Sequence, residues 1–175
     1  MEVPGLRPVL ALAGPVEPAV RAGTAGWPVP PILVRDAAAK HDAYAAAAVG
    51  LIKSGTSSLE VAVAGVPHVV GYKVNPITAE IVRKLIKVPH VSLVNLLAER
   101  EVVPELLQQD CTPARLAAAL VRLLRDPAAV AAQRAGFAAV LARLTPAEGL
   151  PSEAAASAVL AVLDAASGNG PAGRG

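Results

Sequence analysis

Residues 49–60 read VGLIKSGTSSLE, an apolar run that breaks at one small, polar turn and then resumes with helical spacing. The apolar run predicts a buried strand, and a tight turn beside an anion needs a residue without a Cβ, here Gly55. The hydroxyl residues after Gly55 can cap a helix whose first N–H groups point at the turn. Glu60 follows about one helical turn later, where its carboxylate can accept hydrogen bonds from the two hydroxyls of a ribose. The stretch therefore predicts a nucleoside-diphosphate site.

The residues that follow extend this stretch to a strand, a helix and a second strand. The helix continues from Val61, stops at Gly65-Val66-Pro67, and gives way to a strand at residues 68–73. Such a βαβ unit has parallel strands. We expect an α/β fold, a Rossmann-like parallel sheet flanked by helices and finished by a helical tail. The other expected strands are 6–13, 32–34 and 88–93, and the other expected helices are 15–25 (a short helix or turn), 36–48, 77–86, 112–125, 126–144 and 152–166.

The chain is expected to form one domain over residues 1–166. Two of its helices have strong start signals, because Thr112-Pro113 and Asp126-Pro127 each place a capping residue before a proline at the first helical position. The glycine-rich residues 167–175 are expected to be disordered. With 175 residues the chain can build one core of ordinary size, but it is small for a complete two-domain transferase.

Composition excludes several classes of function. The net charge is only +2 and aromatic residues are 2% of the chain, so neither a field nor a stacking surface for nucleic acid is expected. No apolar run approaches the roughly 20 residues that span a bilayer, and no signal peptide is expected. The single cysteine, Cys111, cannot form an intrachain disulfide, which suits a reducing cytoplasm.

The sequence from Ser54 to Gln108 resembles the donor-binding half of lipid-A-disaccharide synthases, which are GT-B glycosyltransferases. The resemblance rests on SGT followed by LE, on GVP with a later YK, and on VSLVNLL, and it continues more weakly over residues 3–166. The SGT and Glu pattern alone also fits other GT-B transferases that use a UDP sugar, whereas VSLVNLL is narrower. The acceptor-binding domain and the opening strand of the donor domain are not in this sequence, so we expect the chain to begin inside a domain.

The resemblance implies a role for each residue around the turn. Four of them are expected to cradle the UDP diphosphate: Ser54, Gly55, Thr56 and Ser57. Taken alone, the same residues also fit an ordinary βα turn with a good cap. Glu60 matches the ribose-binding carboxylate of the family, although a lone glutamate is usually a solvated helix residue. Lys53 either adds positive charge beside the phosphates or reaches solvent.

Two further segments are candidates for the substrate site. Asn95 is a single amide in an apolar segment, either a satisfied structural amide that holds a loop or, by the resemblance, a residue of the active cleft near the nucleotide sugar. Glu101 belongs to a run of charges that fits a solvated surface, but the resemblance places it at the cleft, where it opens a helix. Tyr72 and Lys73 follow a strand at the carboxyl edge of the sheet, where open α/β folds bind ligands.

The remaining charged residues give weaker evidence for a functional site. Lys73 stands where the family often has arginine, so a point charge would replace a bidentate phosphate contact. The basic residues of the next helix form either a solvated face or a strip that meets anionic lipid or the acceptor phosphate: Arg83, Lys84 and Lys87. The three histidines share no metal-ligand spacing, no Asp-x-Asp pair is present, and we expect neither a metal nor a cofactor. His68 is interpreted as a structural residue.

The resemblance implies transfer of 2,3-diacylglucosamine from UDP-2,3-diacylglucosamine to 2,3-diacylglucosamine 1-phosphate, with release of UDP, in lipid A biosynthesis. This chain would hold UDP, and the general base would lie in the acceptor domain, so no catalytic residue is assigned and the isolated chain is expected to be inactive. Its expected place is the cytoplasm, with peripheral contact to the inner membrane, as a homodimer or with a partner chain that supplies the acceptor domain. The alternative is a non-catalytic interaction module, either a split subunit or a relic.

Overall fold

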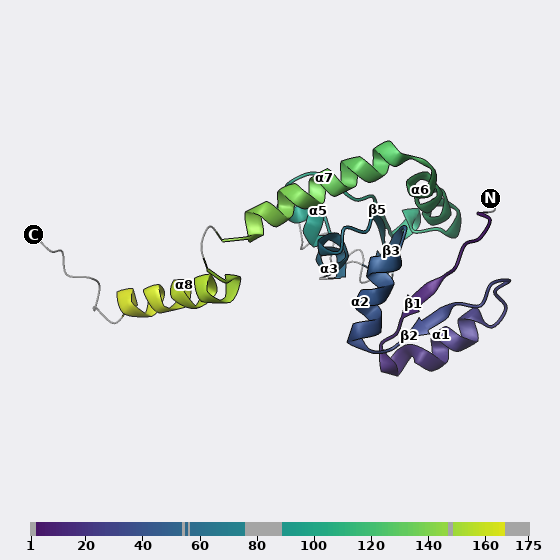
Figure 1. Cartoon of the computed structure of the whole chain (residues 1–175), viewed down its shortest axis with the longest axis horizontal. Coiled ribbons are helices and arrows are strands. Elements are labelled where there is room, and N and C mark those ends of the chain that lie inside the picture. Colours follow the sequence, from purple (N-terminus) through teal and green to yellow (C-terminus); the bar gives the residue numbers. More distant parts are fainter. Residues whose placement is uncertain (1–2, 54, 56, 76–88, 147–148, 167–175) are drawn as a thin grey trace, which may run out of the picture. The chain divides into compact units, whose positions relative to one another are not determined.

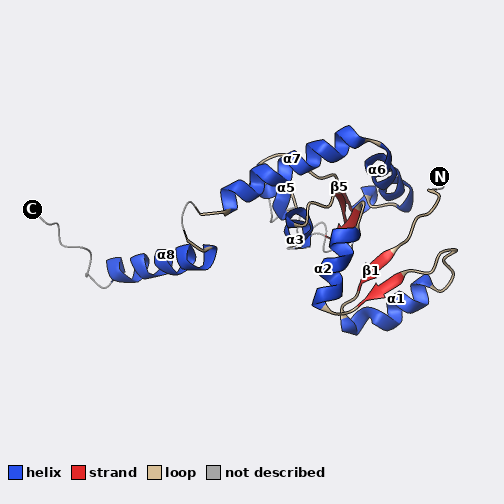
Figure 2. Ribbon diagram, viewed as in Figure 1, coloured by secondary structure: helices blue, strands red, loops and turns tan. Residues whose placement is uncertain are grey.

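Strands and helices alternate through most of the chain (Figure 1). The computed structural model describes residues 3–53, 55, 57–75, 89–146 and 149–166. All strand pairs among these residues are parallel. The α/β prediction, with parallel sheets flanked by helices, is therefore confirmed (Figure 2).

The strands are short and fall into two sheets, β1-β2 and β3-β4-β5. Their bounds are β1 Val9–Ala11, β2 Ile32–Val34, β3 Gly50–Lys53, β4 His68–Tyr72 and β5 Glu105–Leu107. The helices before β5 are η1 Gly14–Val16, α1 Glu17–Thr24, α2 Ala37–Ala46, α3 Ser57–Val63 and α5 Leu93–Ala98. The helices after β5 are η2 Gln108–Asp110, α6 Pro113–Arg125, α7 Pro127–Leu144 and α8 Pro151–Ala166.

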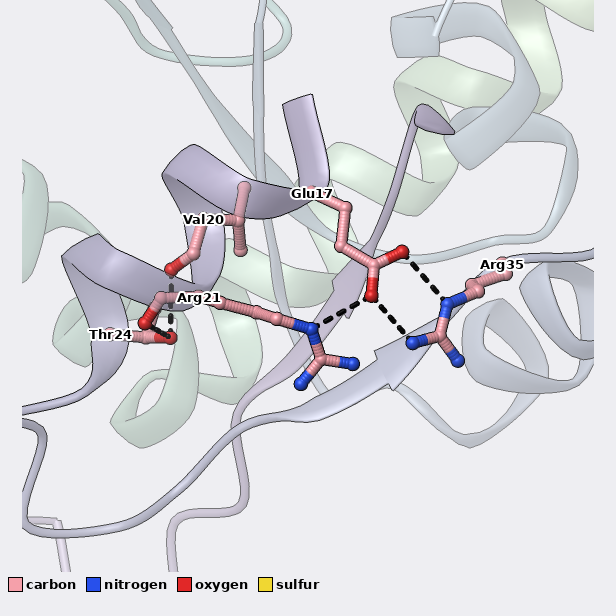
Figure 3. A network of polar contacts seen from close by, with 5 residues as sticks. All are labelled: Glu17, Val20, Arg21, Thr24 and Arg35. Carbon is pink, nitrogen blue, oxygen red and sulfur yellow. Dashed lines mark hydrogen bonds and ion pairs between the residues drawn. The ribbon is translucent and has the colours of Figure 1, made fainter. Parts of the chain in front are cut away.

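A charged network ties α1 to the end of β2 (Figure 3). Arg35 directly follows β2 and donates hydrogen bonds to both carboxylate oxygens of Glu17, at 2.9 and 2.6 Å. Arg21, one turn further along α1, donates to the same carboxylate at 2.8 Å. The hydrogen bonds from Arg35 and Arg21 lower the pKa of the Glu17 carboxyl to about 2. The network therefore keeps its charges throughout the neutral pH range.

The second sheet carries the core of the molecule. Its central strand β4 lies between β3 and β5, with Lys53 opposite Gly71 and Tyr72 opposite Leu107. Because the three strands are parallel, the loops after their carboxyl ends meet at one edge of the sheet. The buried core cluster consists of Ala62, Val70, Val94, Val102, Val103 and Phe137.

Most of the predicted elements are confirmed, and their start signals explain why. The side chains of Asp36 and Thr112 accept hydrogen bonds from the backbone N–H groups of Ala39 and Arg115, which caps α2 and α6. Asp126 accepts from two N–H groups at the start of α7 in the same way. The predicted helix at 77–86 and the predicted disordered tail at 167–175 lie outside the described residues.

Two predictions in the VSLVNLL region are wrong. Residues 89–92 form bends instead of a strand, and α5 begins at Leu93 because the Ser92 hydroxyl accepts a hydrogen bond from the Asn95 N–H at 3.1 Å. No helix opens at Glu101, since the backbone there continues as an irregular loop into β5. The strand β5 itself was not predicted. Its three residues are too few for an apolar pattern to stand out.

The chain divides into two compact units, residues 1–137 and 138–175. In the second unit, α8 confirms the expected helical tail and begins with half of a capping box, in which Glu153 accepts a hydrogen bond from the Leu150 N–H at 2.9 Å. Several of its apolar side chains are exposed: Val159, Leu160, Val162 and Leu163.

His68 opens the central strand with a fully buried imidazole. The ring stacks on Phe137 with 5.2 Å between centroids, and Nδ1 donates to the Val66 carbonyl at 2.9 Å. Among the described residues, Nε2 has no hydrogen-bond partner. Burial lowers the pKa of His68, although the hydrogen bond to Val66 acts in the opposite direction. The histidine is therefore neutral in the folded chain at physiological pH.

We expect the free energy of unfolding to fall as the pH decreases from about 7.5 to about 5.5. The unfolded imidazole takes up a proton near pH 6.5, whereas the buried imidazole of His68 does not, so the unfolded state binds more protons in this window. The slope is at most about 1.4 kcal/mol per pH unit. Urea denaturation across the range measures it. His68→Phe should remove this component of the slope, and an identical slope in both proteins would contradict the assignment.

Candidate functional site

The turn after β3 is built around Gly55. Its φ of +136° lies in the region that favours glycine, which explains why this residue type is needed at the turn. The buried Ser58 hydroxyl donates to the Gly55 carbonyl at 3.1 Å and fixes the turn to the start of α3. Ser57, the first residue of α3, is exposed. The predicted cradle residues Ser54 and Thr56 lie outside the described residues.

Two predicted residues meet at the carboxyl edge of the sheet. Lys53 and Tyr72 are the last residues of the neighbouring strands β3 and β4. The Lys53 ammonium lies 5.6 Å from the centroid of the Tyr72 ring, within the range of a cation–π contact. Lys73 follows directly and is exposed. Lys53 and Lys73 thus put two positively charged residues at the carboxyl ends of β3 and β4.

Glu60 lies in the first turn of α3 and is partly exposed. One of its carboxylate oxygens, Oε2, accepts a hydrogen bond at 3.0 Å from the ammonium of Lys40 on α2. The other, Oε1, accepts none from a described residue. Within the described part of the chain, the carboxylate is therefore held at one oxygen only.

Asn95 is fully buried and lies in the short helix α5. Its Oδ1 accepts hydrogen bonds from the N–H groups of Val102 and Val103 at 2.7 and 2.9 Å. Its Nδ2 donates to the Val103 carbonyl and to Glu105 Oε1, both at 2.8 Å. All four bonding positions of the amide are thus used inside the protein. These contacts match the alternative of a satisfied structural amide that holds a loop.

The carboxylate of Glu105 completes this network. Besides Asn95, it accepts hydrogen bonds from the N–H groups of Val91 and Ser92 at 2.9 and 3.0 Å. Glu105 is the first residue of β5, so it fastens the loop before α5 to the amino end of that strand. The hydrogen-bond network of Ser92, Asn95 and Glu105 stabilises the fold by joining the loop before α5 to β5. This role explains why polar residues occur in an apolar segment.

The structure brings only some of the predicted residues together. Those near the carboxyl edge of the second sheet are Lys53, Gly55, Ser57, Glu60, Tyr72 and Lys73. Asn95 contacts the residues that lead into the amino end of β5, and Glu101 is exposed in the same loop, where it lines a pocket of about 320 Å³ with residues of α6 and α7. Asn95 and Glu101 are therefore less suited to contact a bound nucleotide than the residues near the carboxyl edge.

Sequence reasoning missed Lys40 and Glu105. Both make their contacts across the fold, Lys40 to a residue 20 positions later and Glu105 to one 10 positions earlier. Lys40 lies on an alanine-rich helix that carries several other polar residues. A polar residue on the helix before β3 was the available signal, because that helix precedes the turn in the same α/β unit.

Two kinds of site are absent from the residues that the structure describes. No group of three or more His, Cys, Asp or Glu side chains in this part of the chain could hold a metal ion. None of the described helices combines the length and the hydrophobicity that crossing a bilayer requires.

Comparison with known proteins connects this geometry to one family. The family model described as Lipid-A-disaccharide synthetase matches residues 32–159. A lipid-A-disaccharide synthase from Gluconobacter oxydans (strain 621H) is 51% identical over 164 residues, which are 94% of this chain and 40% of the relative. The synthase from Granulibacter bethesdensis is 47% identical over 92% of this chain and 44% of its own length. The lipid-A-disaccharide synthase from Rhodospirillum centenum is 43% identical over 91% of this chain and 40% of its own length.

The chain spans about 40% of the length of the curated relatives it matches. Within that part, the match contains the strand β3, the Gly55 turn and the helix α3 as well as the Asn95 network. Since the family model covers well over half of the sequence and three relatives exceed 40% identity, the chain belongs to the lipid-A-disaccharide synthase family.

Proposed function

We propose that this chain is the donor-binding part of a lipid-A-disaccharide synthase. The reaction is the transfer of 2,3-diacylglucosamine from its UDP donor to 2,3-diacylglucosamine 1-phosphate, with UDP released, in lipid A biosynthesis. The observation that carries the proposal is the family match across residues 32–159, because this region includes the turn and the edge of the sheet described above. The proposed donor domain spans residues 1–166.

The residues at the carboxyl edge suit a nucleoside diphosphate. The diphosphate would lie on the backbone around Gly55, which has no Cβ to obstruct it. Because α3 has only seven residues, we assign most of the favourable charge to Lys53 and Lys73 instead of the helix dipole. These cations would stabilise the negative charge that builds up on the departing UDP. Glu60 would accept hydrogen bonds from the ribose hydroxyls.

The acceptor side of the reaction needs other residues. Attack by the acceptor hydroxyl requires a general base, which we place in the part of the full-length relatives that this chain does not cover. We therefore expect no transfer by this chain alone, and we propose that a partner chain that carries the acceptor domain completes the site. The helices after Thr112 would join two copies of this chain as a homodimer. Its lipid substrates would bring it to the cytoplasmic face of the inner membrane as a peripheral protein.

Calorimetric titration of UDP into the purified chain tests the proposal, with ADP as the mismatched nucleotide. Binding of UDP in preference to ADP is the expected result. A folded chain that binds neither nucleotide would overturn the proposal and favour a non-catalytic interaction module. Adding the uncovered part of the Gluconobacter oxydans relative as a separate polypeptide then tests the division of roles, because transfer should occur only in the mixture.

A further inference from the structure

The ion pair between Lys40 and Glu60 bridges the helix before β3 and the helix after it. The Lys40 ammonium lies 3.0 Å from Glu60 Oε2, although the residues are 20 positions apart in the sequence. The two side chains retain 32% and 46% of their exposure, so neither is buried by the contact. A surface ion pair of this kind contributes little to stability. Because the ion pair includes a residue of the candidate site, its role is better sought in ligand binding than in stability.

Lys40 is itself held in place. It is one turn before Tyr44 on α2, and its ammonium lies 5.9 Å from the centroid of the tyrosine ring. The hydrogen bond to Glu60 raises the pKa of Lys40, with the charge of Glu60 adding to the effect. Lys40 therefore remains a cation at every physiological pH. A fixed cation on one oxygen restricts the rotamers of the Glu60 carboxylate.

The ion pair between Lys40 and Glu60 also reduces the negative charge near the Gly55 turn. An unpaired Glu60 would repel a diphosphate on the residues around Gly55, since both groups are anions. Pairing with Lys40 offsets this repulsion while Oε1 stays free of hydrogen bonds from described residues. A carboxylate that is paired with a cation at one oxygen, and whose other oxygen has no partner among the described residues, is suited to accept hydrogen bonds from a hydroxyl beside a phosphate group.

We propose that Lys40 is a positioning residue that orients Glu60 toward the ribose and thereby sets the preference for ribonucleotides over 2′-deoxyribonucleotides. The inference rests on the proposed UDP site. Lys40 does not contact the nucleotide in this arrangement; it acts through Glu60. Loss of the ammonium should therefore affect discrimination at the sugar more than the binding of the diphosphate.

The test compares the dissociation constants of UDP and 2′-deoxy-UDP by calorimetry. We expect the wild-type chain to prefer UDP by about 30-fold, as a hydrogen bond to a charged group would give. In Lys40→Met the preference should fall to about threefold, and in Lys40→Arg it should stay near the wild-type value. Arg122→Met is the matched control, because it removes a cation from another exposed ion pair, with Asp126 near the end of α6.

The possible results separate this inference from the proposed function. UDP binding with an equal or larger preference in Lys40→Met overturns the role of Lys40 alone. Failure of the wild-type chain to bind UDP overturns the proposed function and this inference together. The melting temperature of each variant shows whether it is folded. If Lys40→Met is destabilised, Lys40→Arg still tests the proposal. Loss of the preference for UDP in the folded arginine variant would count against the proposal.

Discussion

Gly55→Asp is expected to lower the affinity of the chain for UDP by at least about 100-fold. Gly55 adopts a φ of +136°, which L side chains rarely adopt, so any replacement strains the turn. Aspartate adds a negative charge where the proposed site holds a diphosphate, and like charges repel. Calorimetric titration of UDP into the folded variant measures the loss.

Two controls separate strain from charge. Gly55→Asn has nearly the same shape as the aspartate variant without its charge, and we expect it to lose affinity by only about tenfold. Gly26→Asp adds the same charge at a glycine with open space around it, and we expect no change. If Gly55→Asp binds UDP as tightly as the wild type, the diphosphate does not lie on this turn.

Local patterns explain why much of the fold could be predicted from the sequence. The strand before Gly55 and the strand after Pro67 are apolar runs bounded by glycine or proline, and such boundaries are set by the nearest residues. The helices α6 and α7 follow Thr112 and Asp126, whose side chains bond to N–H groups only two or three positions later. Information of this kind is readable without tertiary structure.

The VSLVNLL segment shows where local patterns fail. A strand was expected over residues 88–93, but Ser92 and Asn95 bond to each other and to Glu105, which lies 13 and 10 positions away. A partly buried carboxylate and a buried amide that satisfy a loop override the strand propensity of the neighbouring valines. The helix α5 is thus a consequence of contacts that no window of a few residues contains.

The residues of the candidate site also differ in whether their contacts are local or distant in the sequence. Gly55 and Glu60 could be proposed as site residues from the sequence because they lie within a few residues of the predicted turn and helix. Lys40 could not, because its partner Glu60 lies 20 positions later in the sequence, on a different helix. Asn95 was assigned by resemblance to the cleft, whereas its contacts give it a structural task. A variant at this position can distinguish the two.

Asn95→Leu is expected to lower the free energy of unfolding by about 4 kcal/mol, because it leaves the buried N–H groups of Val102 and Val103 and the Val103 carbonyl without their partner. Leucine fills a similar space, so the loss reports the hydrogen bonds more than a cavity. Urea denaturation measures it, with Gln109→Ala, an exposed amide, as a control that should change stability by less than about 0.5 kcal/mol. An amide whose task is to contact the substrate would give the opposite result: weaker UDP binding with a loss of stability below about 1 kcal/mol.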